Sequence, residues 1–347
     1  MTRLFVFSAI AATLAASCKV DPELLPVVPP VALHQEIPAG WPRPVYTFSN
    51  NEITAERFEL GRYLFYETLL SSNNEFSCGS CHQQVVAFTQ ADHQFSHGVT
   101  NENGKRNSPA LFNLAWMPYF MHDGALNHIE VQPLGPINNP IEMGEETANV
   151  WKKLQATSKY QKLFKAAYGD SLVTTDRAMK AIAQFMGLFL SNQSKYDRVK
   201  EGESKFSSAE QTGYDLFKAK CASCHVEPLF SDFKFRNNGL AIDKNLKDGG
   251  RGQLKPEEPE HLYCFKTPSL RNIAFTGPYM HDGRYTTLRE CLDHYTNKIE
   301  NKINLDPLLE NGIPMTDAEK EAIIAFLNTL SDYEFINNPQ YKDPNFK

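Results

Sequence analysis

Two short motifs of cysteine and histidine carry the chemistry that is easiest to read from this sequence. Residues 78–82 read CGSCH and residues 221–225 read CASCH. Two thiols at this spacing can form thioether bonds with the vinyl groups of a porphyrin, and the adjacent histidine can then bind the iron. The motifs therefore predict two covalently bound haem c groups. The attachment residues are Cys78, Cys81, Cys221 and Cys224, and the proximal iron ligands are His82 and His225.

Two other uses of paired cysteines fit these motifs less well. A thioredoxin-like motif needs neither the following histidine nor a second copy, and no βαβ pattern surrounds either motif. A zinc site could use both pairs of cysteines, but a histidine would then follow each pair by coincidence. Haem attachment accounts for the cysteines and the histidine together.

The N-terminal residues predict export. Residues 1–17 contain one basic residue, an apolar stretch and then small residues, which is the pattern of a signal peptide. The small residues before Cys18 resemble a lipoprotein cleavage site, so we expect a lipid on Cys18; cleavage by the ordinary signal peptidase is the alternative. Residues 18–45 are rich in proline and read as a lipoprotein tether or linker. We therefore expect the protein in the periplasm, or at the outer membrane as a lipoprotein.

The composition describes a globular protein that is long enough for two domains. The chain has 347 residues and a formal charge of −6 with no basic cluster, which argues against nucleic acid as a partner. Strand-like alternation is sparse, and apolar residues recur at helical spacing in six segments. These segments are residues 54–70, 145–168, 173–200, 208–220, 285–299 and 317–330.

A repeated segment predicts that the two motifs belong to two related domains. Residues 109–124 and 268–283 are identical at eight of sixteen positions, and both end in Met-His-Asp-Gly. Each copy follows a CxxCH motif in the same order. We therefore expect a mostly α-helical fold with two cytochrome c-like haem domains related by internal duplication, over residues 46–204 and 205–347.

The sequence resembles the bacterial dihaem cytochrome c peroxidases and their MauG-type relatives from about residue 48 to residue 330. The segments that carry the resemblance are LGRYLFYETLLSSNNEFSCGSCH, GKRNSPALFN, QPLGPINNPIEMG, FKTPSLRN and PYMHDGRYTTLRE. The resemblance implies that the N-terminal domain is peroxidatic and reacts with hydrogen peroxide. The C-terminal domain would transfer electrons to it from a small cytochrome c or copper protein. Family members often form homodimers, so the resemblance implies that state as well.

The resemblance also assigns residues to a peroxide pocket. Gln132 and Glu142 match the distal glutamine and the catalytic glutamate. A carboxylate can move a proton from one peroxide oxygen to the other, and an amide can donate a hydrogen bond to the bound oxygen. Without a haem nearby, Glu142 would read as a solvated loop carboxylate. His97 matches a displaceable distal iron ligand; the alternatives are His93 in that role or an exposed histidine.

A calcium site between the domains is a further implication of the resemblance. Asn107 would supply a side-chain oxygen, and Thr276 and Pro278 would supply main-chain carbonyl oxygens. Hard oxygen ligands of this kind suit calcium, and water would complete its shell.

Two positions depart from the usual peroxidase pattern. Tyr295 stands where many peroxidases have a methionine ligand of the second haem, as it does in the MauG-type enzymes. A phenolate would stabilise ferric iron and lower the haem potential; alternatively Tyr295 only packs, with His294 or no ligand on the iron. His122 stands where the family usually has a tryptophan between the haems, and Trp116 could compensate.

The leading prediction of function is an exported dihaem c-type peroxidase that reduces hydrogen peroxide to water with electrons from a small redox protein. His97 favours this reading. The alternative is a MauG-type dihaem oxidase that uses the same haem chemistry to oxidise residues of a partner protein, and Tyr295 favours it. A plain electron carrier is a third reading. Cys264 and Cys291 lie outside the motifs and could form a disulfide after export.

Overall fold

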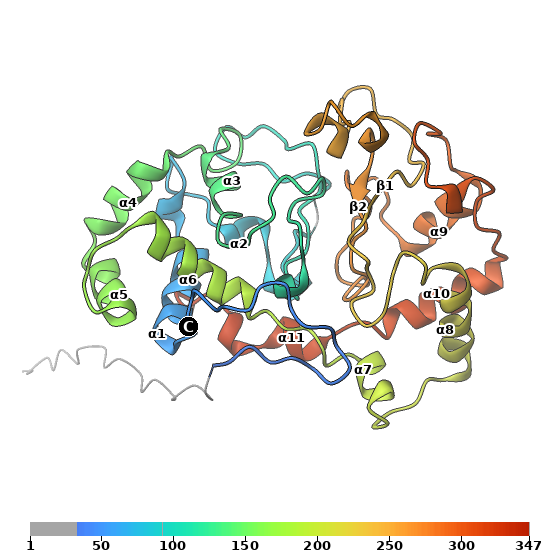
Figure 1. Cartoon of the computed structure of the whole chain (residues 1–347), viewed down its shortest axis with the longest axis horizontal. Helices are drawn as coiled ribbons and strands as arrows, with labels where there is room; N and C mark the ends of the chain where they lie inside the picture. The colour runs from blue at the N-terminus through green and yellow to red at the C-terminus, as the bar shows by residue number, and fades with distance from the viewer. Residues whose placement is uncertain (1–32, 92, 347) are drawn as a thin grey trace, which may run out of the picture. The chain divides into compact units, whose positions relative to one another are not determined.

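The computed structural model describes residues 33–91 and 93–346, so Cys18, the predicted signal peptide and most of the predicted tether lie outside the described residues. The described residues form eleven α-helices and one two-stranded sheet (Figure 1). The prediction of a mostly α-helical protein is confirmed. No helix in this part of the chain has the length and apolar character that a membrane span requires.

The helices follow the order of the two predicted halves. The first half contains α1 (Ala55–Phe65), α2 (Cys78–Cys81), α3 (Leu134–Asn138), α4 (Thr147–Gln155), α5 (Ser158–Tyr168) and α6 (Thr175–Gly187). The first half also contains α7 (Lys195–Lys200), and the second half contains α8 (Ser208–Lys220), α9 (Leu288–Asn297), α10 (Asp317–Asn328) and α11 (Tyr333–Asn337). Strands β1 (Phe235–Arg236) and β2 (Phe265–Lys266) pair antiparallel, with Phe235 opposite Lys266.

Side-chain caps set where the longer helices begin. Thr54 accepts a hydrogen bond from the main-chain N–H of Arg57 at the start of α1. Thr316 and Glu319 form a reciprocal capping box at the start of α10, which satisfies two N–H groups that the helix itself cannot use.

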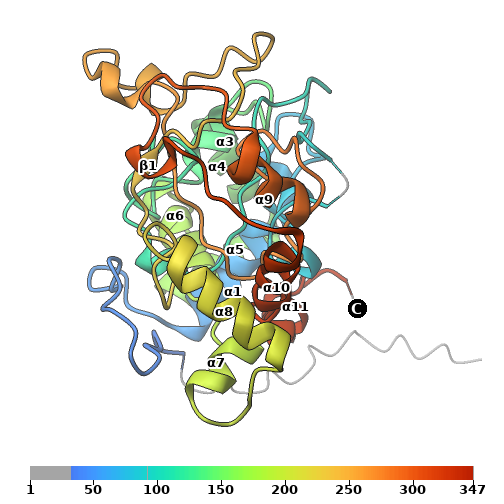
Figure 2. The same ribbon diagram turned by 90° about the vertical axis from the view of Figure 1, so that its right-hand side faces the viewer.

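Each half is built on one close helix pair, α1 with α6 and α8 with α10. The pair of α8 and α10 faces the viewer in Figure 2. Both pairs cross at a glycine. A Cβ atom on Gly61 would lie 1.9 Å from the carbonyl oxygen of Ala181, and one on Gly213 would lie 1.8 Å from that of Ala322. Only glycine allows these backbones to approach so closely.

The helix predicted over residues 173–200 is wrong in its middle, because α6 ends at Gly187 and α7 begins after Ser194. The backbone between them finds hydrogen-bond partners outside a helix. The N–H of Ser191 donates to Oδ1 of Asn113 at 2.9 Å, and the Ser191 hydroxyl donates to Asp332 at 2.9 Å. A capping box of Ser194 and Asp197 then starts α7.

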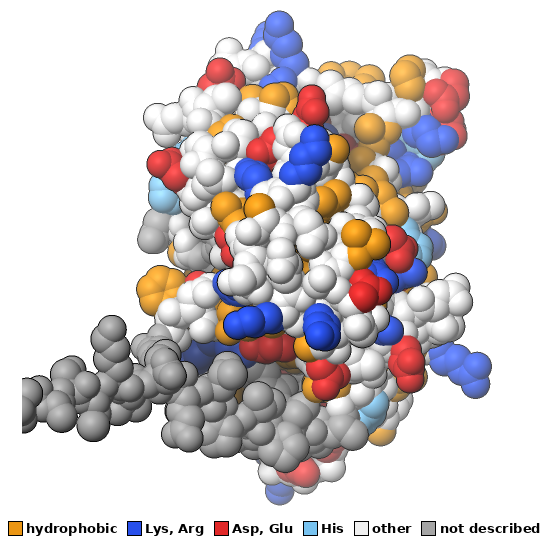
Figure 3. Space-filling model, turned by 90° about the vertical axis from the view of Figure 1, so that its left-hand side faces the viewer, with side chains coloured by type: hydrophobic (Ala, Val, Ile, Leu, Met, Phe, Trp, Pro, Cys, Tyr) orange, Lys and Arg blue, Asp and Glu red, His pale blue; other side chains and the backbone are white. Residues whose placement is uncertain are grey.

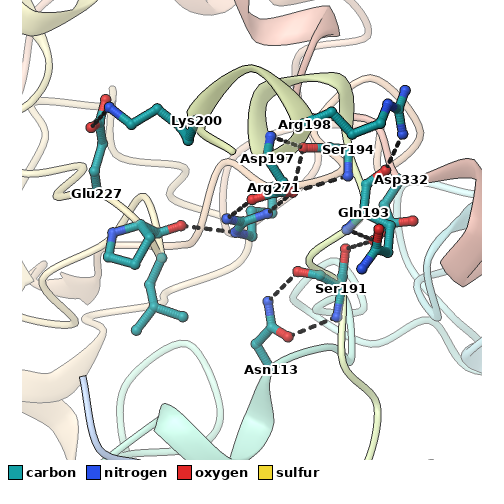
Figure 4. Close-up of polar contacts among 12 residues, drawn as sticks. Asn113, Ser191, Gln193, Ser194, Asp197, Arg198, Lys200, Glu227, Arg271 and Asp332 are labelled. Atoms are coloured by element: carbon teal, nitrogen blue, oxygen red, sulfur yellow. Dashed lines mark hydrogen bonds and ion pairs between the residues drawn. The ribbon is translucent and has the colours of Figure 1, made fainter. Parts of the chain in front are cut away.

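A buried ion pair fastens α7 to the second half of the chain (Figure 4). The guanidinium of Arg271 is fully buried and donates to both oxygens of Asp197, at 2.8 and 2.7 Å. Its Nε donates to the carbonyl oxygen of Pro228 at 2.8 Å, and the Trp41 ring lies 4.6 Å away. Trp41 belongs to the predicted tether, so that end of the tether packs on the folded chain.

The C-terminal tail packs against aromatic residues of the first half. Phe335 in α11 contacts the ring of Phe88, and Tyr341 contacts Phe189 at 4.9 Å between ring centroids. The Tyr66 hydroxyl donates to the carbonyl oxygen of Tyr341 at 2.7 Å. Residues 34–347 form one compact unit, and the boundary between residues 204 and 205 stays a prediction.

Figure 3 shows the face of the molecule on the side of α4 and α5. Basic, acidic and apolar side chains are interspersed on this face rather than gathered by type. Such a surface creates no strong field of a single sign, in line with the modest net charge of the chain.

Candidate haem and peroxide site

One large cavity connects the two CxxCH motifs. Its volume is about 1100 Å³, whereas a site for one drug-sized molecule occupies roughly 300–1,000 Å³. The cavity is lined by Cys78, Cys81, His82, Cys221, Cys224 and His225. The structure therefore brings both predicted attachment motifs to a single space that is large enough for more than one small cofactor.

The first motif is presented by the short helix α2. His82 follows this helix, and its Nδ1 lies 2.8 Å from the carbonyl oxygen of Phe88. Nδ1 therefore carries the proton and donates, which leaves the lone pair of Nε2 free for a metal ion. Burial lowers the pKa of His82, so the neutral form that binds metals is favoured.

The second motif repeats this geometry at the end of α8. Nδ1 of His225 lies 3.1 Å from the carbonyl oxygen of Phe230, and burial again lowers the pKa of the imidazole. Phe88 and Phe230 are both fully buried and both have positive φ values, 59° and 53°. In each half the two sulfurs, a free imidazole Nε2 and a large adjoining cavity suit one haem c group.

The cavity wall near the first motif contains the predicted peroxide-pocket residues Gln132 and Glu142. One carboxylate oxygen of Glu142 accepts a hydrogen bond from the Asn139 amide at 2.8 Å. Burial raises the pKa of Glu142, while the Asn139 amide opposes that shift. A carboxyl group with a raised pKa exchanges protons closer to neutral pH, which suits a proton-transfer role.

His97 also lines this cavity, and its Nδ1 is buried without a hydrogen-bond partner among the described residues. A buried polar atom without a partner is costly and calls for an explanation, and an iron ion in the cavity would supply one. His93 is exposed and does not line the cavity in the part of the chain that the structure describes. Of the two candidates, His97 is therefore the one placed to bind the first haem.

The segment that carries His97 is packed tightly on the segment that carries Glu142. The N–H of Val99 donates to the carbonyl oxygen of Glu142 at 2.9 Å. A Cβ atom on Gly98 would lie only 2.0 Å from that same oxygen. The segment of the predicted iron ligand His97 therefore contacts the segment of the predicted acid–base residue Glu142. A residue larger than glycine at position 98 could not keep this contact.

Tyr295 lies on α9 and lines the cavity near the second motif. Burial raises the pKa of Tyr295 to about 12, and the Asn238 amide acts in the opposite direction. A phenolate at this position would therefore need the positive charge of a metal ion. His294, the alternative, donates from Nε2 to the carbonyl oxygen of Asn238 at 2.9 Å and does not line the cavity in the described residues.

The three residues of the predicted calcium site also line the cavity. The N–H of Asn107 donates to the carbonyl oxygen of His281 at 2.8 Å, which brings it close to the segment of Thr276 and Pro278. The Asn107 amide nitrogen donates to the carbonyl oxygen of Gln94 at 3.1 Å. The amide nitrogen is thus satisfied by the main chain. Calcium binding by the oxygens of these residues stays a prediction.

The wall of the shared cavity also contains aromatic and histidine side chains. The rings of Phe265 and His281 stack with centroids 3.7 Å apart. His122 binds the carbonyl oxygen of Asn107 through Nε2 at 2.8 Å, so it is a hydrogen-bonded corner residue. Trp116 packs on Trp41 and does not line the cavity in the described part of the chain. It therefore does not compensate for the family tryptophan that His122 replaces.

Some residues of the site were not found from the sequence. Asn238, Arg106 and Lys266 line the cavity, but the sequence analysis assigned no role to them, although Arg106 and Lys266 lie in segments that carry the resemblance. Cys264 and Cys291, considered as a disulfide, are both free thiols in the structure. Cys264 is buried and its Sγ donates weakly to the carbonyl oxygen of Glu260, whereas Cys291 lines the cavity.

Comparisons with known proteins agree with this geometry. A family model described as di-haem cytochrome c peroxidase matches residues 55–205. The methylamine utilization protein MauG of Methylorubrum extorquens is 34% identical over 291 residues, which cover 81% of this chain and 79% of the relative. The cytochrome c551 peroxidase of Nitrosomonas europaea is 31% identical over 294 residues, covering 84% and 83%.

Solved structures show the same fold. A MauG-like protein associated with microbial copper homeostasis superposes with a TM-score of 0.80 and 32% identity, covering 90% of this chain and 99% of the other. The diheme peroxidase BthA from Burkholderia thailandensis has a TM-score of 0.73 at 22% identity, covering 82% and 88%, and shows likeness of fold alone. This chain therefore belongs to the family of the di-haem cytochrome c peroxidases and MauG proteins.

Proposed function

We propose that this protein reduces hydrogen peroxide to water at the haem on Cys78 and Cys81. Two electrons and two protons convert each peroxide into two water molecules. The electrons would enter through the haem on Cys221 and Cys224, from a small cytochrome c or copper protein. The observation that carries the proposal is the half-buried carboxyl group of Glu142, with its raised pKa, on the cavity wall near the first motif.

The haem iron, when bound, supplies an oxygen-binding site and two-electron redox chemistry. The protein residues manage the protons. Glu142 accepts the proton from one peroxide oxygen and returns it to the other, while the Asn139 amide holds its carboxylate in place. The Gln132 amide lies near the sulfur of Met121 and can donate a hydrogen bond to an oxygen of the peroxide. His97 closes the site when it binds the iron and opens it when it leaves.

Replacement of Glu142 tests this role. Glu142→Gln keeps the shape of the side chain but removes its acid–base function, so it should lose most peroxide turnover while both haem spectra stay unchanged. Glu146→Gln is the matched control, because Glu146 is exposed, four residues away and outside the cavity lining. Equal turnover in the two variants would refute the role of Glu142.

A second candidate function is the oxidation of residues in a partner protein, which the resemblance to the MauG-type enzymes implies. Tyr295 favours it, because an anionic oxygen ligand would stabilise oxidised iron in the second haem. The two functions differ in the number of electrons that the donor supplies for each peroxide. A peroxidase consumes two equivalents of reduced donor per peroxide, whereas the oxidase function would leave two oxidising equivalents on a protein substrate.

We also propose that residues 46–204 and 205–347 are duplicated domains. Matched local geometry supports this proposal. Asn113 and Asn272, which are 159 positions apart, have φ values of 53° and 58°, and Met121 and Met280 have 65° and 72°.

The proposed function has four further parts. They are calcium at Asn107, export to the periplasm, a lipid anchor and a homodimer.

A further inference from the structure

One lysine on the cavity wall has no counter-ion. Lys266 lies in β2 and lines the cavity that the two motifs share. None of the ion pairs among residues 33–91 and 93–346 includes Lys266, whereas the arginines of the same wall are paired. In agreement with this geometry, burial lowers the pKa of Lys266 to about 8.

The other cations of the cavity wall are either paired or exposed. Arg106 binds Asp123 at 2.5 Å and Asp248 at 2.6 Å. Other pairs join Arg236 to Asp232 and Asp306, and Lys220 to Glu319. Lys105 and Lys247 are exposed to solvent. Among the described residues that line the cavity, Lys266 is the one half-buried lysine or arginine without an acidic partner.

The backbone holds Lys266 in a fixed place. Its N–H donates to the carbonyl oxygen of His122 at 2.7 Å, and it pairs with Phe235 across the two strands. Its ammonium group lies 5.7 Å from the ring centroid of Phe233, which offers at most a weak cation–π contact. A charge kept in such a place without a partner is costly, so the site is built to receive an anion.

We propose that Lys266 binds a propionate carboxylate of a haem group, at the point where the two haem sites meet. Each haem c carries two propionate groups. When the haems are bound, these propionates are the acidic groups that they bring into the cavity. The inference rests on the presence of two haems but not on peroxide turnover. Through this contact, Lys266 holds a positive charge beside one haem and raises its reduction potential.

Redox titration of both haems tests the contact without measuring activity. Lys266→Met keeps the length of the side chain and removes its charge, and Lys247→Met removes an exposed charge from the same cavity wall. We expect Lys266→Met to shift the midpoint potential of one haem to a lower value, because its propionate loses its counter-charge. Lys247→Met should leave both potentials nearly unchanged, and Lys266→Arg should keep them near those of the wild type.

Equal potentials in Lys266→Met and the wild type would overturn the proposal. If that variant fails to incorporate haem, a crystal structure of the wild-type holoprotein decides. It should place the Lys266 ammonium about 2.7–2.9 Å from a propionate oxygen. An ammonium with no propionate within hydrogen-bond reach, or with a solvent anion there instead, would equally overturn it. Loss of the Glu142 function would leave these results unchanged, so the two proposals fail separately.

Discussion

The contact between the His97 and Glu142 segments predicts the effect of one added methyl group. In Gly98→Ala, the new Cβ atom would lie 2.0 Å from the carbonyl oxygen of Glu142 and 2.5 Å from that of Ile141. Real Cβ atoms essentially never approach within 3.0 Å, so the two segments must separate by about 1 Å. The hydrogen bond from Val99 to Glu142 would lengthen or break.

The segment that carries His97 should be the one that moves. Main-chain bonds hold the Glu142 segment on both sides, from Met143 to Pro136 and from Ser72 to Met143. The His97 segment is a turn with exposed residues from Thr100 to Glu102, and the N–H of Gly104, which donates to Ser96, joins its two ends. The methyl group should therefore disfavour the closed position of His97 and leave Glu142 in place.

The size of the effect follows from the cost of overpacking. One methyl group forced into a packed place costs about 1–3 kcal/mol. That cost applies to the closed state and is relieved when the His97 segment moves away. A bias of this size raises the ratio of open to closed protein about 5–150-fold.

The assay mixes the fully oxidised protein rapidly with hydrogen peroxide and monitors the reaction by the absorbance of the haems. The wild type should react slowly, because His97 closes the site. Gly98→Ala should react about 5–150-fold faster, by the same factor as the ratio of open to closed protein. Gly104→Ala is the matched control, because a Cβ atom there would lie 3.4 Å from its nearest neighbour. Equal rates in both variants and the wild type would refute the reasoning.

Three further predictions concern the second haem, the buried ion pair and acid stability. Tyr295→Phe should change the ferric spectrum of one haem only, and an identical spectrum would exclude ligation by Tyr295. Arg271→Met should lower the free energy of unfolding by about 3–5 kcal/mol in chemical denaturation, because Asp197 is left buried and charged; adding Asp197→Leu should recover much of this loss. Burial lowers the pKa of His122 and of His281 to about 4, so the unfolded chain binds more protons than the folded chain between pH 6.5 and 4. Stability should therefore fall as the pH drops through this window, and a flat profile would contradict the buried neutral state.

Local chemistry explains what could be predicted from the sequence. The CxxCH motifs place sulfur and imidazole within a few residues, so their role needs no knowledge of the fold. The cap at Thr316 depends only on Glu319, three residues along the chain. Gln132 and Glu142 were assigned by resemblance alone, and the structure places both on the cavity wall.

Long-range contacts explain what was missed. The helix over residues 173–200 breaks because Asn113 and Asp332, far away in the sequence, bind the backbone and side chain of Ser191. The exposure of Lys266 to the cavity depends on how its strand pairs with Phe235 and with the carbonyl of His122. Neither contact leaves a periodic pattern or a motif in the sequence.

The central claim is that the haem on Cys78 and Cys81 has a face beside Glu142 that His97 can close and open. Electron paramagnetic resonance of the purified protein, fully oxidised and then with one electron added per chain, tests it most directly. The account predicts two haem signals in the oxidised state, the first haem bound by two histidines. That haem should lose one axial ligand after the first electron and then react with peroxide. A single haem signal, or a first haem that keeps both ligands in the two states, would contradict the account.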